Sequence, residues 1–178
     1  IDQARAIDYT ITCSGGGNFT ISGPQIPQFA GGNCSGIATI PLGVTSMAGN
    51  AFAKTNPSTS NRGLVTSVVF PASGFTEIGA SALALTNLTS ISIPSSVTSI
   101  GAQAFASNPS LTSASIAGST NVGTPLNTSY YIFNETPNLT TLNLGSGAIN
   151  LNWLMFAGSS LTSVTGGNGV LLVQDQSF

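Results

Sequence analysis

The strongest constraint on the fold is an internal repeat of the sequence. Similar segments start at Val65, Leu88, Leu111, Leu139 and Leu161, and the clearest copy reads Leu-Thr-Ser-Ile-Ser-Ile-Pro. The start-to-start spacings are 23 (65 to 88), 23 (88 to 111), 28 (111 to 139) and 22 residues (139 to 161). Because one short unit cannot bury its apolar side chains alone, the repeat predicts coils that stack into a solenoid.

A second apolar phrase follows the first one in each unit. It covers residues 44–48, 75–79 and 97–101, and each copy leads to an Ala-Phe-Ala or Ala-Leu-Ala triplet. The 28-residue unit absorbs an insertion around residues 121–130. A period of this length falls in the range of leucine-rich repeats. We expect the aromatic residues of the second phrase to pack in the core, namely Phe52, Phe105, Phe133, Phe156 and the neighbouring Trp153.

Residues 88–106 resemble the repeat of the BspA-like, treponemal-type leucine-rich-repeat proteins of bacterial surfaces. That repeat reads approximately as a Leu-x-x-Ile-x-Ile-Pro strand, a Val-Thr-Ser-Ile-Gly turn and an Ala-Phe helical turn. The opening residues 9–23 resemble the N-terminal capping hairpin of the family. The likeness covers roughly residues 9–165, and a Cys common late in the family's repeat is absent, with Asn108 and Thr136 near its place.

The resemblance implies a fold and a function class. The expected fold is a β-rich solenoid with one parallel strand per coil, short helical or 3-10 turns and an N-terminal β-hairpin cap. We expect residues 1–36 to form the cap, residues 37–165 to form about five to six repeats, and residues 166–178 to form a C-terminal strand. The family is mostly bacterial, extracellular or surface-attached, and associated with adhesion and protein binding.

The two cysteines indicate an oxidising compartment. Cys13 and Cys34 lie in Gly- and Ser-rich surroundings, and a disulfide between them would close a loop of about 20 residues and contribute about 3 kcal/mol. Two free thiols in a reducing compartment are the alternative. The start of the chain lacks the basic and apolar regions of a signal peptide, as expected of a processed or a trimmed protein. Glycosylation sequons begin at Asn18, Asn33, Asn87, Asn127, Asn134 and Asn138, and in a chain rich in Asn and Thr they also arise by chance.

Composition excludes several classes of partner. Only 4% of residues are charged, and the basic ones are Arg5, Lys54 and Arg62. Three scattered cations cannot neutralise the phosphates of a nucleic acid or hold an anionic membrane surface. The longest apolar stretches, residues 153–157 and 170–173, are far shorter than a membrane-spanning helix. We therefore predict no nucleic-acid binding and no membrane insertion.

Enzymatic residues are equally scarce. The chain has no His, which excludes an imidazole base and a His-based triad. Glu77 and Glu135 occupy different positions of the repeat, so they do not align as a glycosidase pair. Asp2 and Asp8 are too few and too terminal to hold a cation. We therefore predict a non-enzymatic protein with no cofactor and no metal.

The strand phrase predicts a face covered with hydroxyl groups. Leu88, Ile91 and Ile93 are expected to point inward, so that Ser90 and Ser92 point outward on a nearly uncharged concave sheet. These hydroxyls either only stabilise neighbouring strands or recognise a protein or glycan ligand, and a regular water-ordering face would suggest ice binding. The candidate binding residues are Thr66, Ser67, Thr89, Ser90, Ser92, Thr112, Ser113, Ser115, Thr141, Asn143 and Ser163.

Two further segments are candidates for contact with partners. Tyr130 and Tyr131 lie in the insertion and either anchor a partner or fold back over the irregular coil. An apolar strand of Val170, Leu171, Leu172 and Val173 follows the last repeat. This strand either continues into further repeats, folds back as a cap, or pairs with the next molecule in a head-to-tail filament.

The sequence therefore predicts an extracellular, non-enzymatic binding or adhesion module whose partner is a protein, a glycan or further copies of itself. A structural subunit of a filament or surface layer is the alternative, and an ice-binding protein is a minor one. Low charge favours self-assembly, because little electrostatic repulsion opposes close association.

Overall fold

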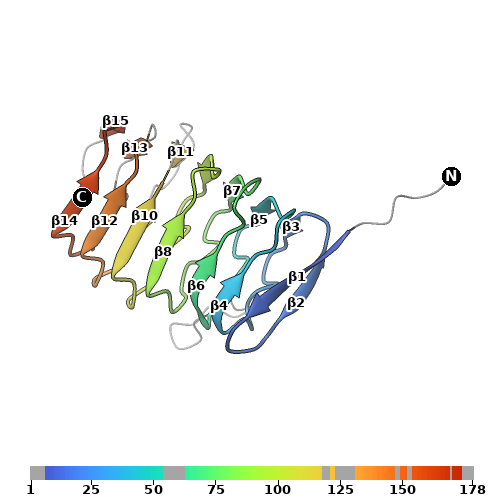
Figure 1. Cartoon of the computed structure of the whole chain (residues 1–178). Helices are drawn as coiled ribbons and strands as arrows, with labels where there is room; N and C mark the ends of the chain where they lie inside the picture. Colours follow the sequence, from blue (N-terminus) through green and yellow to red (C-terminus); the bar gives the residue numbers. More distant parts are fainter. Residues whose placement is uncertain are drawn as a thin grey trace.

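The computed structural model describes residues 7–53, 63–117, 121–122, 131–146, 149–151, 154–168 and 170–173. Within these residues successive repeats form a stack of coils, with the N-terminal strands at one end and the last strands at the other (Figure 1). Each coil contributes one strand to a long side and one shorter strand to a second side. A turn segment then returns the chain to the next coil.

The strands of the long side pair in parallel, and the sheets they form are open. Ser113 of β10 lies opposite Ser90 of β8 and Thr141 of β12, so the 28-residue unit does not shift the register. β6 and β8 belong to different sheets but are joined by a hydrogen bond from Thr89 N to Thr66 O of 2.9 Å. The strands are β4 (Gly36–Thr39), β6 (Val65–Val69), β8 (Ser90–Ile93), β10 (Ser113–Ile116), β12 (Thr141–Leu144) and β14 (Ser163–Gly166).

The second side is also a ladder of parallel strands. Its five-stranded part consists of β3 (Gln25–Ile26), β5 (Ser46–Met47), β7 (Glu77–Ile78), β9 (Ser99–Ile100) and β11 (Asn121–Val122). β13 (Ile149–Leu151) and β15 (Val170–Val173) form a separate parallel pair. Within the described residues, neighbouring coils therefore hydrogen-bond along both sides, except that β11 and β13 are not paired on the second side.

The N-terminal end of the stack begins with an antiparallel hairpin of β1 (Asp8–Cys13) and β2 (Phe19–Ser22). β1 also pairs antiparallel with β4, so it adds one strand to the long side ahead of the first parallel strand. The predicted disulfide between Cys13 and Cys34 is present, with the two Cα atoms 5.4 Å apart.

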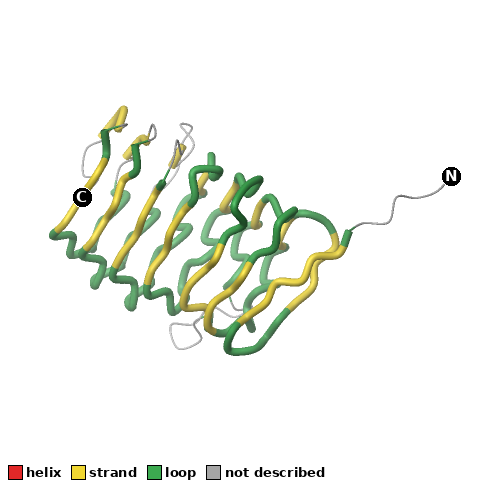
Figure 2. Tube along the Cα trace, viewed as in Figure 1, coloured by secondary structure: helices red, strands yellow, loops and turns green. Residues whose placement is uncertain are grey.

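The predicted helical turns are absent: the described residues contain strands, turns and bends but no helix (Figure 2). No membrane-spanning helix occurs in this part of the chain either. Alternate backbone N–H groups of the turn segments donate to the next coil, while those between them close tight turns within the segment, as Ala84 N does to Ser81 O at 3.1 Å. Leu83 N donates to Ala104 O at 2.8 Å, Phe105 N to Ile132 O at 3.0 Å, and Phe133 N to Met155 O at 2.9 Å.

Left-handed residues explain why these segments do not become helices. The residue two before the central apolar side chain has φ of 54° at Ser81 and 58° at Gln103. The residue two after it has φ of 54° at Leu85 and 56° at Ser107. Since a right-handed helix needs a negative φ throughout, the two left-handed residues in each of these two turns stop helix formation and direct alternate N–H groups to the next coil.

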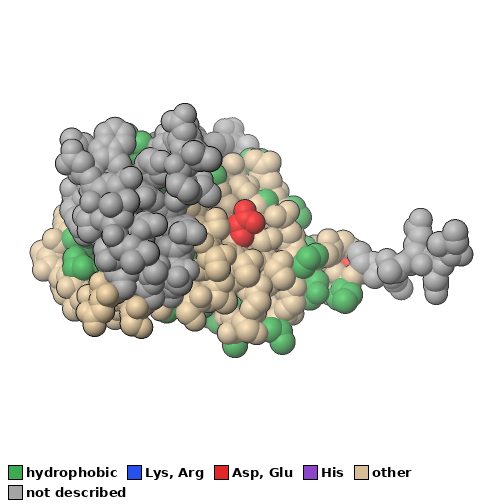
Figure 3. Space-filling model, turned by 90° about the horizontal axis from the view of Figure 1, so that it is seen from above, with side chains coloured by type: hydrophobic (Ala, Val, Ile, Leu, Met, Phe, Trp, Pro, Cys, Tyr) green, Lys and Arg blue, Asp and Glu red, His purple; other side chains and the backbone are tan. Residues whose placement is uncertain are grey.

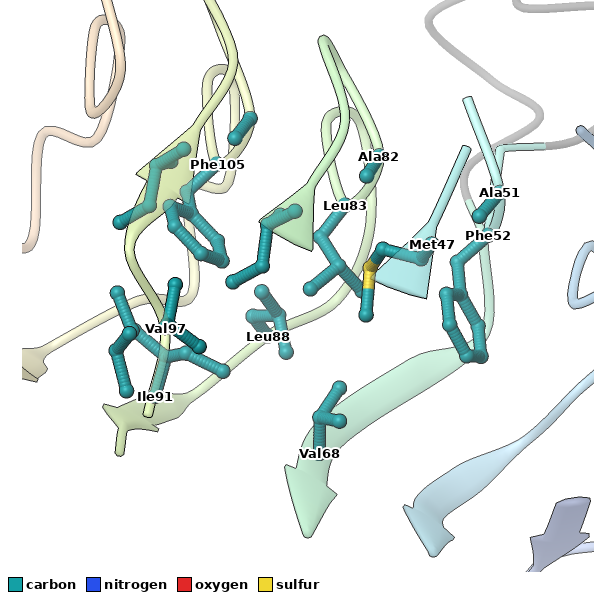
Figure 4. Close-up of a cluster of buried hydrophobic side chains, with 14 of the residues drawn as sticks. Met47, Ala51, Phe52, Val68, Ala82, Leu83, Leu88, Ile91, Val97 and Phe105 are labelled. Carbon is teal, nitrogen blue, oxygen red and sulfur yellow. The ribbon is translucent and has the colours of Figure 1, made fainter. Parts of the chain in front are cut away.

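The core fills the space between the sides and runs through the whole stack. The four phenylalanines predicted to be core are buried, with Phe105 and Phe133 stacked at 5.1 Å and Phe133 and Phe156 at 5.3 Å between ring centroids. Leu83 takes the equivalent place between Phe52 and Phe105 (Figure 4). Trp153 lies outside the described residues. The prediction that the phenylalanines of the second phrase pack in the core is therefore confirmed.

Candidate binding face

The long side presents two columns of small polar side chains, which we name the Ser90 column and the Ser92 column. Strand pairing aligns Ser90 with Ser113, Thr141 and Ser163 in the first column. It aligns Ser92 with Ser115, Asn143 and Thr165 in the second. The inward residues between them are buried, with Leu88 and Ile93 at 0% exposure and Ile91 at 3%. We call the outward surface of the long-side strands the long face.

The side chains of these two columns are free to meet a ligand. Ser90 and Ser92 are exposed, and Ser113 and Ser115 are half-buried. Among the described residues, none of these four hydroxyls has a hydrogen-bond partner within the protein. Because a serine hydroxyl both donates and accepts, each one offers two kinds of bond to a bound molecule.

The threonines predicted for the same face behave differently. The Oγ1 atom of Thr89 donates to Thr66 O at 3.3 Å, and that of Thr112 donates to Thr89 O at 3.1 Å. Thr140 and Thr162 continue the ladder with distances of 3.4 Å. These bonds are longer, and hence weaker, than the usual O–H···O distance of about 2.7–2.8 Å. Each of these threonine hydroxyls nevertheless donates its proton within the protein. The four serine hydroxyls make no such bond among the described residues.

A hollow of about 600 Å³ opens on the long face where β6 meets β8. Its lining combines hydroxyl and amide groups of both columns with an apolar wall from the end of β6 and the residues after it. The lining residues are Ser67, Val68, Val69, Phe70, Pro71, Ala72, Ser90, Ile91, Ser92, Pro94, Ser113, Ala114, Ser115, Thr141 and Asn143. The hollow thus brings together seven of the predicted binding residues.

The apolar wall was missed by the sequence prediction. Val69 is 49% exposed and stands where later coils carry Ser92 and Ser115, while Ile37 of β4 pairs with Ser67 and is 44% exposed. The sequence itself indicates this wall, because Val69 is apolar at a repeat position that is polar in the later copies. The long face therefore changes from partly apolar near β4 and β6 to hydroxyl-covered from β8 onward.

Among the described residues, no charged side chain lines the hollow on this face. The charged side chains within the described residues are Asp8, Glu77 and Glu135, and none of them lines the hollow. Glu77 belongs to β7 on the second side, and Glu135 lies in a turn segment, where Ser107 Oγ donates to its Oε2 at 2.7 Å. Seen from above, the described surface is mostly uncharged (Figure 3). Glu77 and Glu135 are therefore not placed as a pair on one side.

Tyr131 and β15, the remaining candidates that the structure describes, are not among the residues that line the hollow. Tyr130 falls outside the described residues, and Tyr131 is half-buried immediately before the buried Ile132. β15, which contains Val170, Leu171, Leu172 and Val173, pairs in parallel with β13 on the second side. Within the described residues, this strand is the last one of the second side and pairs with β13 alone.

Comparison with known proteins gives a family. The family model described as BspA type leucine rich repeat region (6 copies) matches residues 18–125 and 59–178. Neither a curated protein nor a solved structure matches the chain. Repeats of this type typically serve as non-enzymatic, protein-binding scaffolds that are extracellular or surface-associated, and the disulfide fits such a location. The match covers most of the sequence and agrees with the stacked parallel strands, so the chain belongs to the BspA-type leucine-rich-repeat family.

Proposed function

We propose that this chain is an extracellular binding module that recognises its ligand on the long face, over the hollow between β6 and β12. The observation that carries the proposal is the set of unpartnered hydroxyls of Ser90, Ser92, Ser113 and Ser115 around that hollow. The strand register holds them in two straight columns. A site built on paired strands is preorganised, so little conformational entropy is lost when a ligand binds.

The proposal is tested by blocking the hollow with long charged side chains. Ser90→Lys and Ser92→Lys would fill the space with ammonium groups while leaving the buried side of the strand unchanged. The variants and the unchanged chain would be applied to an array of glycans and to a panel of immobilised extracellular-matrix proteins. Ser110→Lys and Ser146→Lys are matched controls, since both serines are exposed and neither lines the hollow.

Binding that is retained by both controls and lost in both face variants supports the long face as the binding surface. Binding that is equal in all five proteins removes it. Circular dichroism and thermal unfolding of each variant would show that the fold is retained.

End-to-end assembly is a second candidate, favoured by the last strand of the long side. Val164 of β14 is 48% exposed, whereas its column neighbours Leu142 and Ala114 are 0% and 3% exposed. Within the described residues, β14 pairs with β12 alone. An unpaired strand edge beside exposed core is a template for pairing with another chain.

Assembly is tested by size-exclusion chromatography with light scattering and by negative-stain electron microscopy. Filaments or a large polymer that disappear in Val164→Lys would support it. A monomer near 17.8 kDa at all protein concentrations would eliminate this candidate.

Ice binding loses its main support and is not proposed. A water-ordering face needs regular threonine hydroxyls that are free to bind water, but those of Thr89, Thr112 and Thr140 donate to main-chain carbonyls. The serine columns that remain free contain Val69 and Asn143, which interrupt a uniform lattice.

A further inference from the structure

We propose that the ligand of the long face is a neutral polysaccharide, a chain of uncharged sugars lying along the stack across β6, β8, β10 and β12. This inference rests on the proposed function and names the chemical class that the hollow fits. Four properties of the hollow support it: its neutrality, its free hydroxyls, its apolar wall and its repeat spacing.

Neutrality excludes ligands that depend on ion pairs. Within the part of the chain that the structure describes, no charged side chain lines the hollow, and the carboxylates of Asp8, Glu77 and Glu135 lie elsewhere. An anionic or cationic polymer would lose water from its charges on this surface and gain no counter-charge in return. An uncharged ligand avoids that cost.

The hydrogen-bonding groups match those of a sugar. The hydroxyls of Ser90, Ser92, Ser113 and Ser115 have no partner among the described residues, and Asn143 adds an amide that donates and accepts. Sugar hydroxyls also donate and accept, so either partner can supply the proton in each bond. Such a pairing leaves few polar groups unsatisfied when the surface loses its water.

The apolar wall provides a surface for the C–H face of a sugar ring. Val69, Phe70 and Pro71 form it at one end of the hollow. The ring of Phe70 is held against that of the buried Phe75, with centroids 5.1 Å apart and planes tilted by 59°. A half-buried aromatic ring in a fixed position binds an apolar surface with little loss of rotamer freedom.

A protein ligand fits this surface less well. The anchors of protein–protein interfaces are mainly Trp, Tyr and Arg, and serine is depleted there. Among the described residues, the lining of the hollow contains none of those three anchors, and five of its residues are serines. Apart from Phe70, its composition therefore differs from that of a typical protein interface.

The spacing of the columns favours a polymer over a single sugar. Adjacent strands lie about 4.8 Å apart, so a similar pair of polar side chains recurs at each step along the stack. A chain of sugars repeats its own hydroxyls at each ring. Each further ring that contacts a further coil adds binding energy without a new loss of translational freedom.

The experiment uses the full chain and soluble polysaccharides as probes. Affinity gel electrophoresis would compare neutral probes (a mixed-linkage β-glucan, a galactomannan, an α-glucan) with anionic ones (polygalacturonate, heparin). We expect retardation by at least one neutral polymer, weaker binding of its short oligosaccharides, and no retardation by the anionic polymers. In Ser92→Lys and in Ser115→Phe, which fills the hollow without adding charge, the dissociation constant should rise about tenfold or more, a loss of about 1.4 kcal/mol or more. Ser110→Lys should bind like the unchanged chain.

Each alternative result has a distinct meaning. If no neutral polysaccharide binds, or if it binds Ser92→Lys and Ser115→Phe as tightly as the unchanged chain, the inference is overturned. If an immobilised matrix protein binds instead and is lost in the same two variants, the proposed function stands with a protein ligand, and only the polysaccharide inference fails. If the long-face variants change the binding of neither class, both proposals fail.

Discussion

The side-chain oxygen of Asn108 accepts two hydrogen bonds from Thr86 of the preceding coil, one from its backbone nitrogen at 3.0 Å and one from its hydroxyl at 2.7 Å. The amide nitrogen of Asn108 donates to the carbonyl oxygens of Leu83 and Phe105, each at 2.8 Å. Both Asn108 and Thr86 are fully buried. This pair therefore joins two coils inside the core, where the family repeat more often has a Cys.

Replacing Asn108 by Leu should destabilise the protein strongly. The backbone N–H of Thr86 and the carbonyls of Leu83 and Phe105 would lose a partner, and buried groups without partners cost about 1–3 kcal/mol each. We expect the free energy of unfolding in urea to fall by about 2–4 kcal/mol. Asn138→Leu is the control: Asn138 is exposed and makes one side-chain bond to Pro109 O, so its loss should stay below about 1 kcal/mol. Equal losses at the two positions would contradict this account.

Substitutions of Gln103 test whether the left-handed backbone conformation of the turn segments limits stability. It is exposed and has φ of 58°, so its side chain contributes little packing while its backbone is strained. Gln103→Gly should stabilise the protein by about 0.5–1 kcal/mol, and Gln103→Val should destabilise it by about 1–2 kcal/mol, as measured by thermal unfolding. At Gln25, an exposed residue in β3 without a positive φ, the order should reverse, because a strand favours Val over Gly. The same order at both sites would rule out the turn conformation as the cause.

The threonine and serine hydroxyls should differ in what they do for stability. Thr112→Val removes a hydroxyl that donates to Thr89 O at 3.1 Å and should lower the free energy of unfolding by about 0.5–1.5 kcal/mol. Ser115→Ala removes a hydroxyl with no partner among the described residues and should change stability by less than about 0.5 kcal/mol. Chemical denaturation of the two variants checks this directly. A larger loss for Ser115→Ala would show that the serine columns are structural.

Loss of the disulfide should weaken one end of the stack selectively. The bond joins Cys13 in β1 to Cys34 just before β4 and closes a loop with a sequence separation of 21. The Cys13→Ser and Cys34→Ser double variant should lose about 3 kcal/mol. Because each coil contacts only its neighbours, hydrogen exchange should accelerate in β1, β2 and β4 and remain nearly unchanged in β12. Uniform acceleration along the whole chain would contradict a stack of locally coupled coils.

Sequence reasoning recovered what the copies of the repeat share. Comparing 88–94 with its copies was enough to place Ile91 in the core, to place Ser90 and Ser92 on the surface, and to identify the aromatic core positions. It failed at the turn segments, which have the composition of a helical turn. Gln103 and Leu85 adopt a left-handed conformation that their side chains do not favour. The hydrogen bonds that Leu85 and Phe105 in the same segments donate to the next coil compensate for this cost. Such bonds between distant residues leave no local signal.

The candidate face was predicted in part. Its serine columns follow from the register, but the hollow depends on residues that differ between copies, such as Val69 and Phe70, and on the interruption of pairing between β6 and β8. The engagement of the Thr89 and Thr112 hydroxyls could not be read from the sequence either, since it requires the distance to the adjacent carbonyl.

The alignment of Ser113 with Thr141 across the long unit has an evolutionary consequence. Extra residues in that unit leave the following strand in phase, so a coil tolerates insertions without disturbing its neighbours. Duplication or loss of one whole unit in the gene would therefore lengthen or shorten the face by a single strand spacing of about 4.8 Å. A lineage could adjust the reach of such a protein to the length of its ligand in discrete increments while every existing column kept its pattern.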